Sequence, residues 1–335
     1  MILVTGGAGF IGSHTCVALA DAGIAFIVLD NLCNSRRSVL ARMERITGAP
    51  VPFVEGDVRD GSMLDHVLTQ HPIDAVIHFA ALKSVGDSVR DPLRYYDNNV
   101  AGTVNLLRAM QTAQVRTLVF SSSATVYGEP EIVPIAEDAP LSPQNPYGAT
   151  KVMMEQVLAD VCAAEPGQWR IARLRYFNPV GAHESGLIGE DPQGVPHNLL
   201  PYVAQVAAGV RERLSVYGGD YPTPDGTGVR DYLHVCDLAD GHLAALRYLR
   251  QHPGLLTLNL GTGQPVSVLQ MVQAFEQACG RPVPYDVVER RPGDAAQYWA
   301  NPALAQELLD WHARHGLARM CQDAWRWQTG VAATL

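Results

Sequence analysis

The chain of 335 residues carries 34 acidic and 25 basic side chains, which gives a formal net charge of −9, and 47% of its residues are hydrophobic. This balance is typical of a soluble globular protein. Nucleic acids and anionic membranes attract basic surfaces, so the acidic charge argues against non-specific binding to either. Apolar runs fall short of the roughly 18 residues of a membrane span, and we expect no membrane insertion.

The first half of the chain alternates short apolar runs with segments of helical periodicity. The pattern predicts helices at 11–21 and 98–111 and a helix that begins near Pro146. It predicts strands at 2–4, 25–29, 51–54, 75–79, 117–120 and 170–175, with 257–260 as a further strand. Buried strands separated by helices are typical of βαβ units. We therefore predict an α/β fold with a Rossmann-type, doubly wound parallel sheet.

The pattern changes from about Asn178 onward. Gly- and Pro-rich stretches at 181–196 and 218–228 interrupt the alternation, as expected of ligand-binding loops. At roughly 100–200 residues per domain, we predict a Rossmann domain over residues 1–177, to which segments near 230–262 return. Residues 178–335 are predicted to form mainly a smaller C-terminal α/β lobe that binds substrate.

Cysteine usage and the N-terminus indicate the compartment. The six cysteines are scattered and form no C-x-x-C pair, so we expect reduced thiols. Ile2-Leu3-Val4 runs as a predicted strand directly into a glycine-rich turn, which leaves no room for a signal peptide. The expected location is the cytoplasm.

A glycine-rich turn, Thr5–Gly12, follows the first predicted strand and opens the first helix. Gly6, Gly9 and Gly12 satisfy G-x-x-G-x-x-G, and starting at Gly7 the segment also satisfies G-x-G-x-x-G. Such glycines permit a tight turn and close approach of the backbone to a pyrophosphate at the helix N-terminus. A tight turn without a ligand is the alternative.

Asp30 supports the dinucleotide interpretation, because it ends the second predicted strand, 18 residues after Gly12. A carboxylate there accepts hydrogen bonds from ribose hydroxyls and repels a 2′-phosphate, so the sequence favours NAD over NADP. We expect Arg36 and Arg37 to be solvated residues at a helix start. Asp57, after the third strand, is placed either to contact the adenine or to form a turn.

A second group of polar residues indicates chemistry. Asn145 as N-cap and Pro146 at the first helical position predict a helix start, which places Tyr147 and Lys151 on one helix face. Lowering a phenol pKa from about 10 to about 7 takes roughly 4 kcal/mol. The Lys151 ammonium, the helix N-terminus and a cationic nicotinamide ring are the candidate sources.

The serines of Ser121–Thr125 complete this group. They follow the fifth predicted strand, at the edge of the sheet where open α/β folds bind ligands. A hydroxyl there can bridge a substrate alcohol and the phenol. The alternative is that Tyr147 is a surface aromatic residue and that the serines cap a loop.

Together these segments resemble the extended short-chain dehydrogenase/reductase superfamily and, within it, the UDP-glucose 4-epimerase family. The resemblance covers nearly the whole chain and includes Thr5–Gly12, Asp30–Ser35, Phe53–Asp57, Ser121–Gly128, Tyr147–Lys151, Leu174–His183, Glu190–Gly194, Asp225–Asp231 and Arg290–Asp294. It implies an isomerase of galactose metabolism with a tightly held NAD. The implied reaction inverts carbon 4 of UDP-glucose or UDP-galactose through a transient 4-keto sugar.

The resemblance also implies residue roles. Tyr147 would remove the proton of the sugar 4-hydroxyl, Ser123 would hydrogen-bond the same oxygen, and Lys151 would hold the nicotinamide ribose. Besides Asp30, Asp57, Tyr147 and Lys151, the implied cofactor contacts are Gly6, Gly9, Phe10, Ile11, Gly12, Asn31, Cys33, Asn34, Ser35, Val58, Phe79, Lys83, Asn98, Ser121 and Tyr176. The nucleotide would be bound firmly and the sugar loosely, because the keto sugar must turn over.

Two arginines are candidates for the UDP phosphates. Arg230 and Arg291 lie near Gly-rich loops, and a guanidinium forks onto phosphate oxygens. A surface ion pair is the alternative for each. Asp294 is placed to hold the uridine ribose. The resemblance puts Tyr298 at the sugar-pocket gate, where its bulk implies a preference against N-acetylated sugars, and adds as substrate neighbours Ser123, Asn178, Asn198, Leu199, Ser215, Tyr217 and Val268.

Three other functions fit parts of this pattern. A nucleotide-sugar 4,6-dehydratase has carboxylates after the catalytic hydroxyl, whereas Ala124 and Thr125 follow Ser123. Action on another UDP-sugar (UDP-N-acetylhexosamine, UDP-xylose or UDP-glucuronate) stays open, since a loose sugar pocket discriminates poorly. A non-catalytic NAD-sensing regulator would usually lack one of the Ser–Tyr–Lys set.

The histidines lack metal-ligand spacing, so we expect no metal. The resemblance implies a homodimer that pairs two helices per subunit, the Tyr147–Lys151 helix among them.

Overall fold

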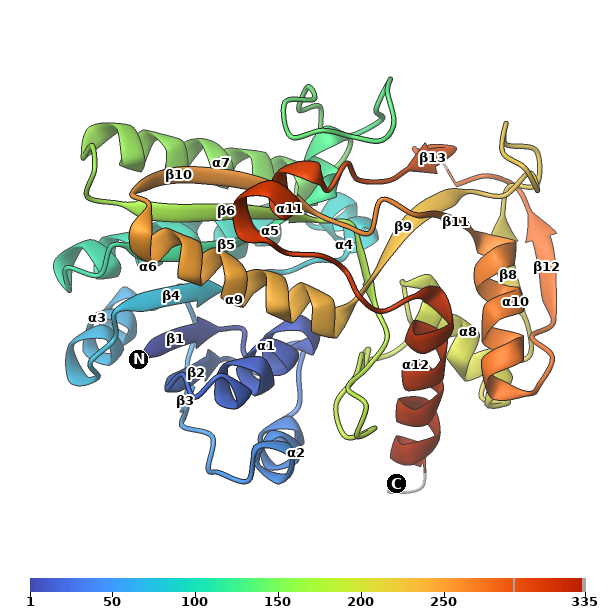
Figure 1. The fold of residues 1–335 in the computed structure, drawn as a ribbon, viewed down its shortest axis with the longest axis horizontal. Helices are drawn as coiled ribbons and strands as arrows, with labels where there is room; N and C mark the ends of the chain where they lie inside the picture. The colour runs from blue at the N-terminus through green and yellow to red at the C-terminus, as the bar shows by residue number, and fades with distance from the viewer. Residues whose placement is uncertain (292, 333–335) are drawn as a thin grey trace.

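Seven parallel strands form the central sheet of the protein (Figure 1). The structure is a computed structural model, and it describes residues 1–291 and 293–332. Pro292, from the predicted Arg290–Asp294 segment, and residues 333–335 lie outside the described residues. The strand order is β10-β6-β5-β4-β1-β2-β3. The strands are β1 (Ile2–Thr5), β2 (Phe26–Asp30), β3 (Phe53–Glu55), β4 (Ala75–His78), β5 (Thr117–Ser123), β6 (Arg170–Tyr176) and β10 (Gly254–Leu260). This order is that of a doubly wound Rossmann sheet, and the predicted fold class is confirmed.

Helices cover both faces of this sheet and close two apolar cores. One face carries α1 (Phe10–Asp21), α2 (Ser38–Thr47), α9 (Val235–Gln251) and α11 (Ala303–Leu309). The other carries α3 (Gly61–Gln70), α6 (Gly102–Thr112) and α7 (Pro146–Ala164). The short helices α4 (Val85–Arg90) and α5 (Pro92–Tyr95) pack against α7. Burial of the strands between these layers explains their continuous apolar runs.

Several elements have other bounds than the sequence predicts; β10, for example, begins at Gly254 rather than Thr257. β3 begins at Phe53 rather than Val51, since Pro52 has no N–H to donate to a neighbouring strand. β5 extends through Ser123, in register with β6 up to the pair Ser123–Tyr176, so the three serines end the strand rather than follow it. The predicted helix 98–111 starts instead as a π-helical turn, η1 (Tyr96–Ala101), which continues into α6.

The C-terminal lobe surrounds a third core. It contains α8 (Leu199–Ala207), α10 (Val268–Cys279) and α12 (Leu317–Ala332). Strand β9 (Val229–His234) pairs with β7 (Asn178–Val180), β11 (Pro265–Ser267) and β13 (Gln297–Tyr298), and β8 (Leu214–Tyr217) pairs with β12 (Tyr285–Val288). Figure 1 shows this lobe beside the carboxyl ends of the central strands, while α9 and β10 extend back along the large sheet.

Two negative findings apply to the part of the chain that the structure describes. In residues 1–291 and 293–332, no helix combines the length and apolarity needed to cross a membrane. Within the same residues, no group of three or more His, Cys, Asp or Glu side chains is arranged to hold a metal ion.

Candidate active site

The glycine-rich turn folds tightly between β1 and α1. A Cβ on Gly12 would lie 2.3 Å from the carbonyl oxygen of Gly6, and Gly6 itself has φ of +68°. Both positions therefore require glycine. The N-cap of α1, Gly9, offers no side-chain acceptor, and the first turn of α1 contains no acidic residue. The first N–H groups of the helix are left to bind an anion, which fits a pyrophosphate.

Asp30 connects this turn to the loop after β2. Its Oδ2 accepts from the Ala8 N–H at 3.1 Å, and its Oδ1 accepts from the Leu32 N–H at 2.8 Å and the Ser35 Oγ at 3.0 Å. Burial raises the pKa of this carboxyl, and the hydrogen bonds partly offset that effect. The predicted cofactor contacts at 6–12 and 30–35 thus form one connected surface.

Three residues that follow Asp30 have carboxylate partners. Asn31 Nδ2 donates to Asp57 Oδ2 at 2.9 Å, and hydrogen bonds from Arg59 hold the pKa of Asp57 well below its usual range. Arg36 pairs with Asp191 at 3.1 Å, and Arg37 pairs with Glu55. Both arginine side chains are exposed, as expected of a solvated helix start.

The predicted catalytic residues meet at the end of β5. Asn145 caps α7 by accepting from the Gly148 N–H at 2.9 Å, as its position in the sequence predicts. The Ser123 hydroxyl lies close enough to the Tyr147 phenol to lower its pKa, and Ser123 Oγ accepts from Thr125 Oγ1 at 2.9 Å. Lys151 Nζ donates to the Ser121 carbonyl at 2.6 Å and lies 5.8 Å from the centre of the Tyr147 ring. A hydroxyl, a phenol and an ammonium therefore share one edge of the sheet.

Burial shifts the pKa values of this group toward the uncharged forms. It raises the pKa of Tyr147 to about 12, although the Ser123 hydrogen bond acts in the opposite direction. It lowers the pKa of Lys151 to about 8, against the attraction of Glu155. Protein groups alone therefore leave the phenol protonated at neutral pH. A positive charge brought close to the phenol would favour its ionised form.

A buried amide links the cofactor and catalytic elements. Asn99 in η1 accepts from the Leu82 N–H at 2.8 Å and from Asn98 Nδ2 at 3.0 Å. It donates to the Leu82 carbonyl at 3.0 Å and to Thr150 Oγ1 at 3.2 Å. All four hydrogen-bonding positions of the side chain are therefore used. This amide holds three elements that carry the predicted site residues Lys83, Asn98 and Lys151.

Tyr176 is held from behind by His242. The His242 Nδ1 lies 2.8 Å from the Leu238 carbonyl and therefore carries a proton, so Nε2 accepts from the Tyr176 hydroxyl at 2.8 Å. His242 also contacts the Phe79 ring at a centroid distance of 4.7 Å. Two predicted cofactor contacts thus share one buried, neutral histidine.

Lys83 and Asn198, predicted for the cofactor and the substrate respectively, meet at one carboxylate. Glu190 Oε1 accepts from Lys83 Nζ at 3.1 Å and from Asn198 Nδ2 at 2.6 Å. The Trp327 Nε1–H donates to the Glu190 carbonyl at 3.0 Å and anchors the loop. Sequence reasoning gave Glu190 no role, although it lies inside a segment that carried the resemblance.

The predicted substrate residues of the C-terminal lobe gather around β9. Arg230 Nη2 lies 3.9 Å from Asp294 Oδ1, and the Arg291 guanidinium stacks on the Tyr217 ring at 3.8 Å. The Val268 N–H donates to the Gly228 carbonyl at 3.1 Å. Of the others, Asn178 lies on β7, Ser215 is exposed on β8, and Leu199 packs against the core of the lobe.

A buried carboxylate fixes this arrangement. Asp231 accepts from the N–H groups of Thr262 at 2.8 Å, Gly263 at 2.9 Å and Ala300 at 3.1 Å, and from Thr262 Oγ1 at 2.6 Å. It thereby ties β9 to the chain just after Tyr298. The Tyr298 hydroxyl donates to the carbonyl of Ala124, the residue that follows Ser123.

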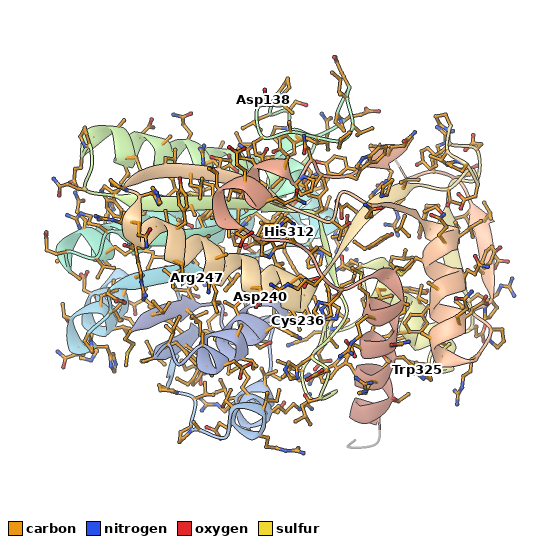
Figure 2. All side chains as sticks on the ribbon, viewed as in Figure 1. Asp138, Cys236, Asp240, Arg247, His312 and Trp325 are labelled. Atoms are coloured by element: carbon orange, nitrogen blue, oxygen red, sulfur yellow. The ribbon has the colours of Figure 1, made fainter. Side chains whose placement is uncertain are left out.

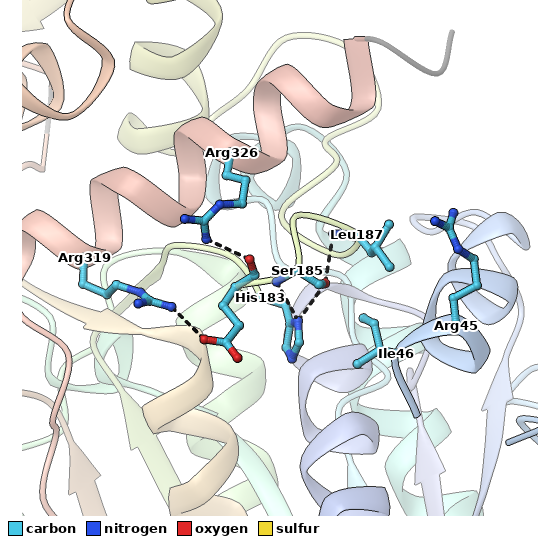
Figure 3. A pocket seen from close by; sticks show the side chains of 8 residues that line it. Arg45, Ile46, His183, Ser185, Leu187, Arg319 and Arg326 are labelled. Atoms are coloured by element: carbon cyan, nitrogen blue, oxygen red, sulfur yellow. Dashed lines mark hydrogen bonds and ion pairs between the residues drawn. The ribbon is translucent and has the colours of Figure 1, made fainter. Parts of the chain in front are cut away.

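Two hollows lie away from this site. One, between α2 and α12, is lined by Arg45, His183, Arg319 and Arg326, but Glu184 binds both α12 arginines (Figure 3). The other, between α1 and α9, includes residues that follow one another along α9, as Figure 2 shows for Cys236, Asp240 and Arg247. Neither contains a predicted site residue.

The fold and this edge of the sheet define a Rossmann-type enzyme that uses a dinucleotide for chemistry on a hydroxyl group. Residues 2–261 match the NAD dependent epimerase/dehydratase family, and the chain belongs to it. It is 56% identical to a UDP-glucose 4-epimerase of Yersinia pestis over 98% of this chain and 97% of that protein. The resemblance found in the sequence is confirmed.

Solved structures agree with these relatives. A UDP-glucose 4-epimerase of Stenotrophomonas maltophila, with bound NAD and formylated UDP-arabinopyranose, superposes with a TM-score of 0.98 at 53% identity, over 100% of this chain and 99% of that chain. The Bifidobacterium longum enzyme, in complex with NAD+ and UDP, has a TM-score of 0.95 at 50% identity over the same shares.

The buried histidines predict a pH dependence of stability. Burial lowers the pKa of His14 and His78 to about 3 and of His234 and His242 to about 4. Unfolding returns each to about 6.5, so the unfolded chain binds protons that the folded chain does not. The contribution of these histidines to the unfolding free energy is fully present above pH 6.5. As the pH drops from 6.5 toward the pKa values of the folded chain, the unfolding free energy falls by up to about 1.4 kcal/mol per pH unit for each histidine.

Urea unfolding at pH 7, 6 and 5 tests this dependence. We expect His14→Gln to flatten the fall of the unfolding free energy with acid, while His66→Gln, at an exposed position, keeps the full slope. Comparing the two variants isolates one histidine, because all other titrating groups are shared. Equal slopes would show that His14 is protonated in the folded state.

Proposed function

We propose that the protein interconverts UDP-glucose and UDP-galactose by inverting carbon 4 through a transient 4-keto sugar. The observation that carries this proposal is the meeting of Ser123, Tyr147 and Lys151 beside a dinucleotide-binding turn. The names of relatives at 53–57% identity over nearly the full chain support the same activity. The protein is then an isomerase with NAD as its cofactor.

The residues of the turn and the neighbouring strand ends suit NAD. The N-terminus of α1 would hold the pyrophosphate, Asp30 the adenosine ribose, and Lys151 the nicotinamide ribose. Bound NAD supplies a hydride acceptor that later returns the hydride to the same carbon. Most of the other cofactor contacts predicted from the sequence lie at or after the carboxyl ends of β1 to β6, and Asn98 lies in η1.

The chain itself handles the proton. Tyr147 accepts the proton of the 4-hydroxyl and gives it back after inversion, and Ser123 hydrogen-bonds the same oxygen. Lys151 contributes positive charge that favours the phenolate. Because Ser123 already contacts the phenol, the proton has a short path in both directions.

The C-terminal lobe would bind the UDP part of the substrate firmly. Arg230 and Arg291 would bind the phosphates, and Asp294 the uridine ribose. We divide the chain accordingly into a cofactor domain over residues 1–177, joined by segments near 230–262, and a substrate lobe mainly over 178–335. The sugar must stay loosely held, since the keto intermediate has to present its opposite face.

One experiment tests the activity directly. Purified protein is incubated with UDP-glucose, UDP-galactose, UDP-N-acetylglucosamine, UDP-xylose and UDP-glucuronate without added NAD, and products are identified by NMR. We expect inversion of the first two. Absence of bound nicotinamide together with no inversion of any UDP-hexose, even when NAD is supplied, would refute the proposal.

Tyr298 supports the preference for sugars without an N-acetyl group. Its hydroxyl is tied to the Ala124 carbonyl, and its ring lies 5.6 Å from that of Phe177, so the bulky side chain is fixed near Ser123. We expect Tyr298→Ala to raise kcat/KM for UDP-N-acetylglucosamine at least tenfold relative to UDP-glucose, because a pocket clash costs about 1–3 kcal/mol. An unchanged ratio of the two kcat/KM values would show that Tyr298 does not exclude the N-acetyl group.

We also propose a homodimer in the cytoplasm, built on α7. An apolar surface formed by Val85, Val89, Leu93 and Met153 is 43–79% exposed on α4, α5 and α7. A second copy of the chain could bury these side chains in a helical interface. We expect Leu93→Asp to halve the mass measured by light scattering, whereas Val210→Asp, equally apolar and exposed in the other lobe, leaves a dimer.

A further inference from the structure

A buried ion pair joins the catalytic helix to the central sheet. Glu155 lies one turn after Lys151 on α7 and accepts from Arg175 twice, from Nε at 2.9 Å and from Nη2 at 2.6 Å. Ser122 Oγ donates to the same carboxylate at 2.6 Å. Glu155, Arg175 and Ser122 are 1%, 3% and 1% exposed. A two-point carboxylate–guanidinium contact at this depth allows one geometry.

This ion pair lies directly behind the reacting groups. Ser122 stands between Ser121, whose carbonyl accepts from Lys151, and Ser123, which contacts Tyr147. On β6, Arg175 directly precedes Tyr176, which is a predicted cofactor contact. A shift of Glu155 along or away from the sheet would therefore move Tyr147 and Lys151 relative to Ser123.

The network continues into the segment that follows Ser123. Arg175 Nη1 donates to the Tyr127 hydroxyl and to the Glu137 carbonyl, each at 2.9 Å. The Tyr127 hydroxyl donates to Asn259 Oδ1 at 2.7 Å. The Arg175 guanidinium thus connects β6 to α7 and to the short helix Ala124–Tyr127, and through Tyr127 also to β10.

Stability alone does not explain charges at this place. Replacing a buried ion pair by apolar residues of similar volume is often neutral or stabilising. Two further charges lie close to the pair: Arg173, whose Nη1 is 3.9 Å from Glu155 Oε2, and Lys151, one helical turn before Glu155. The groups that surround Lys151 include Tyr147 and Glu155 on α7, His78 on β4, and the Ser121 carbonyl and Phe120 ring on β5. Glu155 is the carboxylate of this set.

We propose that Glu155 and Arg175 are positioning residues for the catalytic pair: they hold α7 where Ser123, Tyr147 and Lys151 meet. This inference rests on the proposed function and deepens it. It explains why a charged pair, rather than an apolar one, occupies the contact between α7 and the sheet.

The decisive variants separate folding from positioning. Removing one partner leaves an unpaired buried charge, so the double variant Glu155→Leu/Arg175→Met is used to restore an uncharged contact. We expect it to fold with bound NAD, to keep the KM for UDP-glucose within about threefold, and to lose at least tenfold in kcat, since small misplacements of reacting groups are costly. Glu155→Gln, which keeps the shape, should move the alkaline decline of kcat to lower pH, because burial then lowers the pKa of Lys151 without opposition.

Asp323→Asn is the matched control. Asp323 is also 1% exposed and pairs with Arg319 and Arg326, but it lies on α12, away from α7. This control should lose thermal stability while its kcat and pH profile stay within twofold of the wild type. Wild-type kcat and an unmoved pH profile in the Glu155 variants would overturn the proposal. Inactivity of the wild-type protein on every UDP-sugar would instead overturn the function on which it rests.

Discussion

Tyr147→Phe is expected to lower kcat by about a thousandfold or more while leaving the affinity for UDP-hexose nearly unchanged. The substitution removes the only atom that accepts the proton of the 4-hydroxyl in the proposed reaction, and general-base catalysis contributes typically 10²–10⁴-fold. The ring stays in place, so binding contacts are kept. Steady-state epimerisation and calorimetric binding of UDP-galactose measure the two quantities separately.

An exposed tyrosine provides the control for this prediction. Burial raises the pKa of Tyr147 to about 12, and positive charge brought close to the phenol would favour the phenolate. Tyr285→Phe, at an exposed position on β12, serves as the control and should retain full activity. Wild-type turnover by Tyr147→Phe would refute the assignment of the base.

Arg291→Ala is expected to raise the KM for UDP-sugars by about ten- to a hundredfold with little change in kcat. Charge-assisted hydrogen bonds to phosphate contribute about 1.5–3 kcal/mol. The phosphates are remote from carbon 4, so their loss affects ground state and transition state alike. Arg291 stacks on Tyr217, and among the described residues no carboxylate forms an ion pair with it.

Its neighbour provides a matched control for this prediction. Arg290 stacks on Tyr221 and is bound by Asp220 at 2.7 Å, so its charge is already used within the protein. Arg290→Ala should change KM less than about threefold, as expected when an exposed ion pair is lost. A fall in kcat with unchanged KM for Arg291→Ala would contradict the assigned role in phosphate binding.

Local features of the chain were predicted well from the sequence. Continuous apolar runs marked every strand of the central sheet, and Asn145-Pro146 marked the start of α7. Gly6 and Gly12 were recognisable from the G-x-x-G-x-x-G spacing after the first strand, and in the structure a side chain at either position would collide with the backbone. Glu155 also had a signal, its spacing of four residues from Lys151, but a carboxylate on a helix face is usually solvated.

The sequence alone indicated the class of protein, because the glycine-rich turn, the Tyr-x-x-x-Lys spacing and the other segments that carry the resemblance are local features of the chain. Tertiary structure decided which distant groups meet: Glu155 with Arg175, Lys83 and Asn198 with Glu190, and Tyr298 with Ala124. It also decided that burial opposes ionisation of Tyr147 and Lys151. Desolvation and long-range pairing depend on how strands and helices pack, and local periodicity carries no information about either.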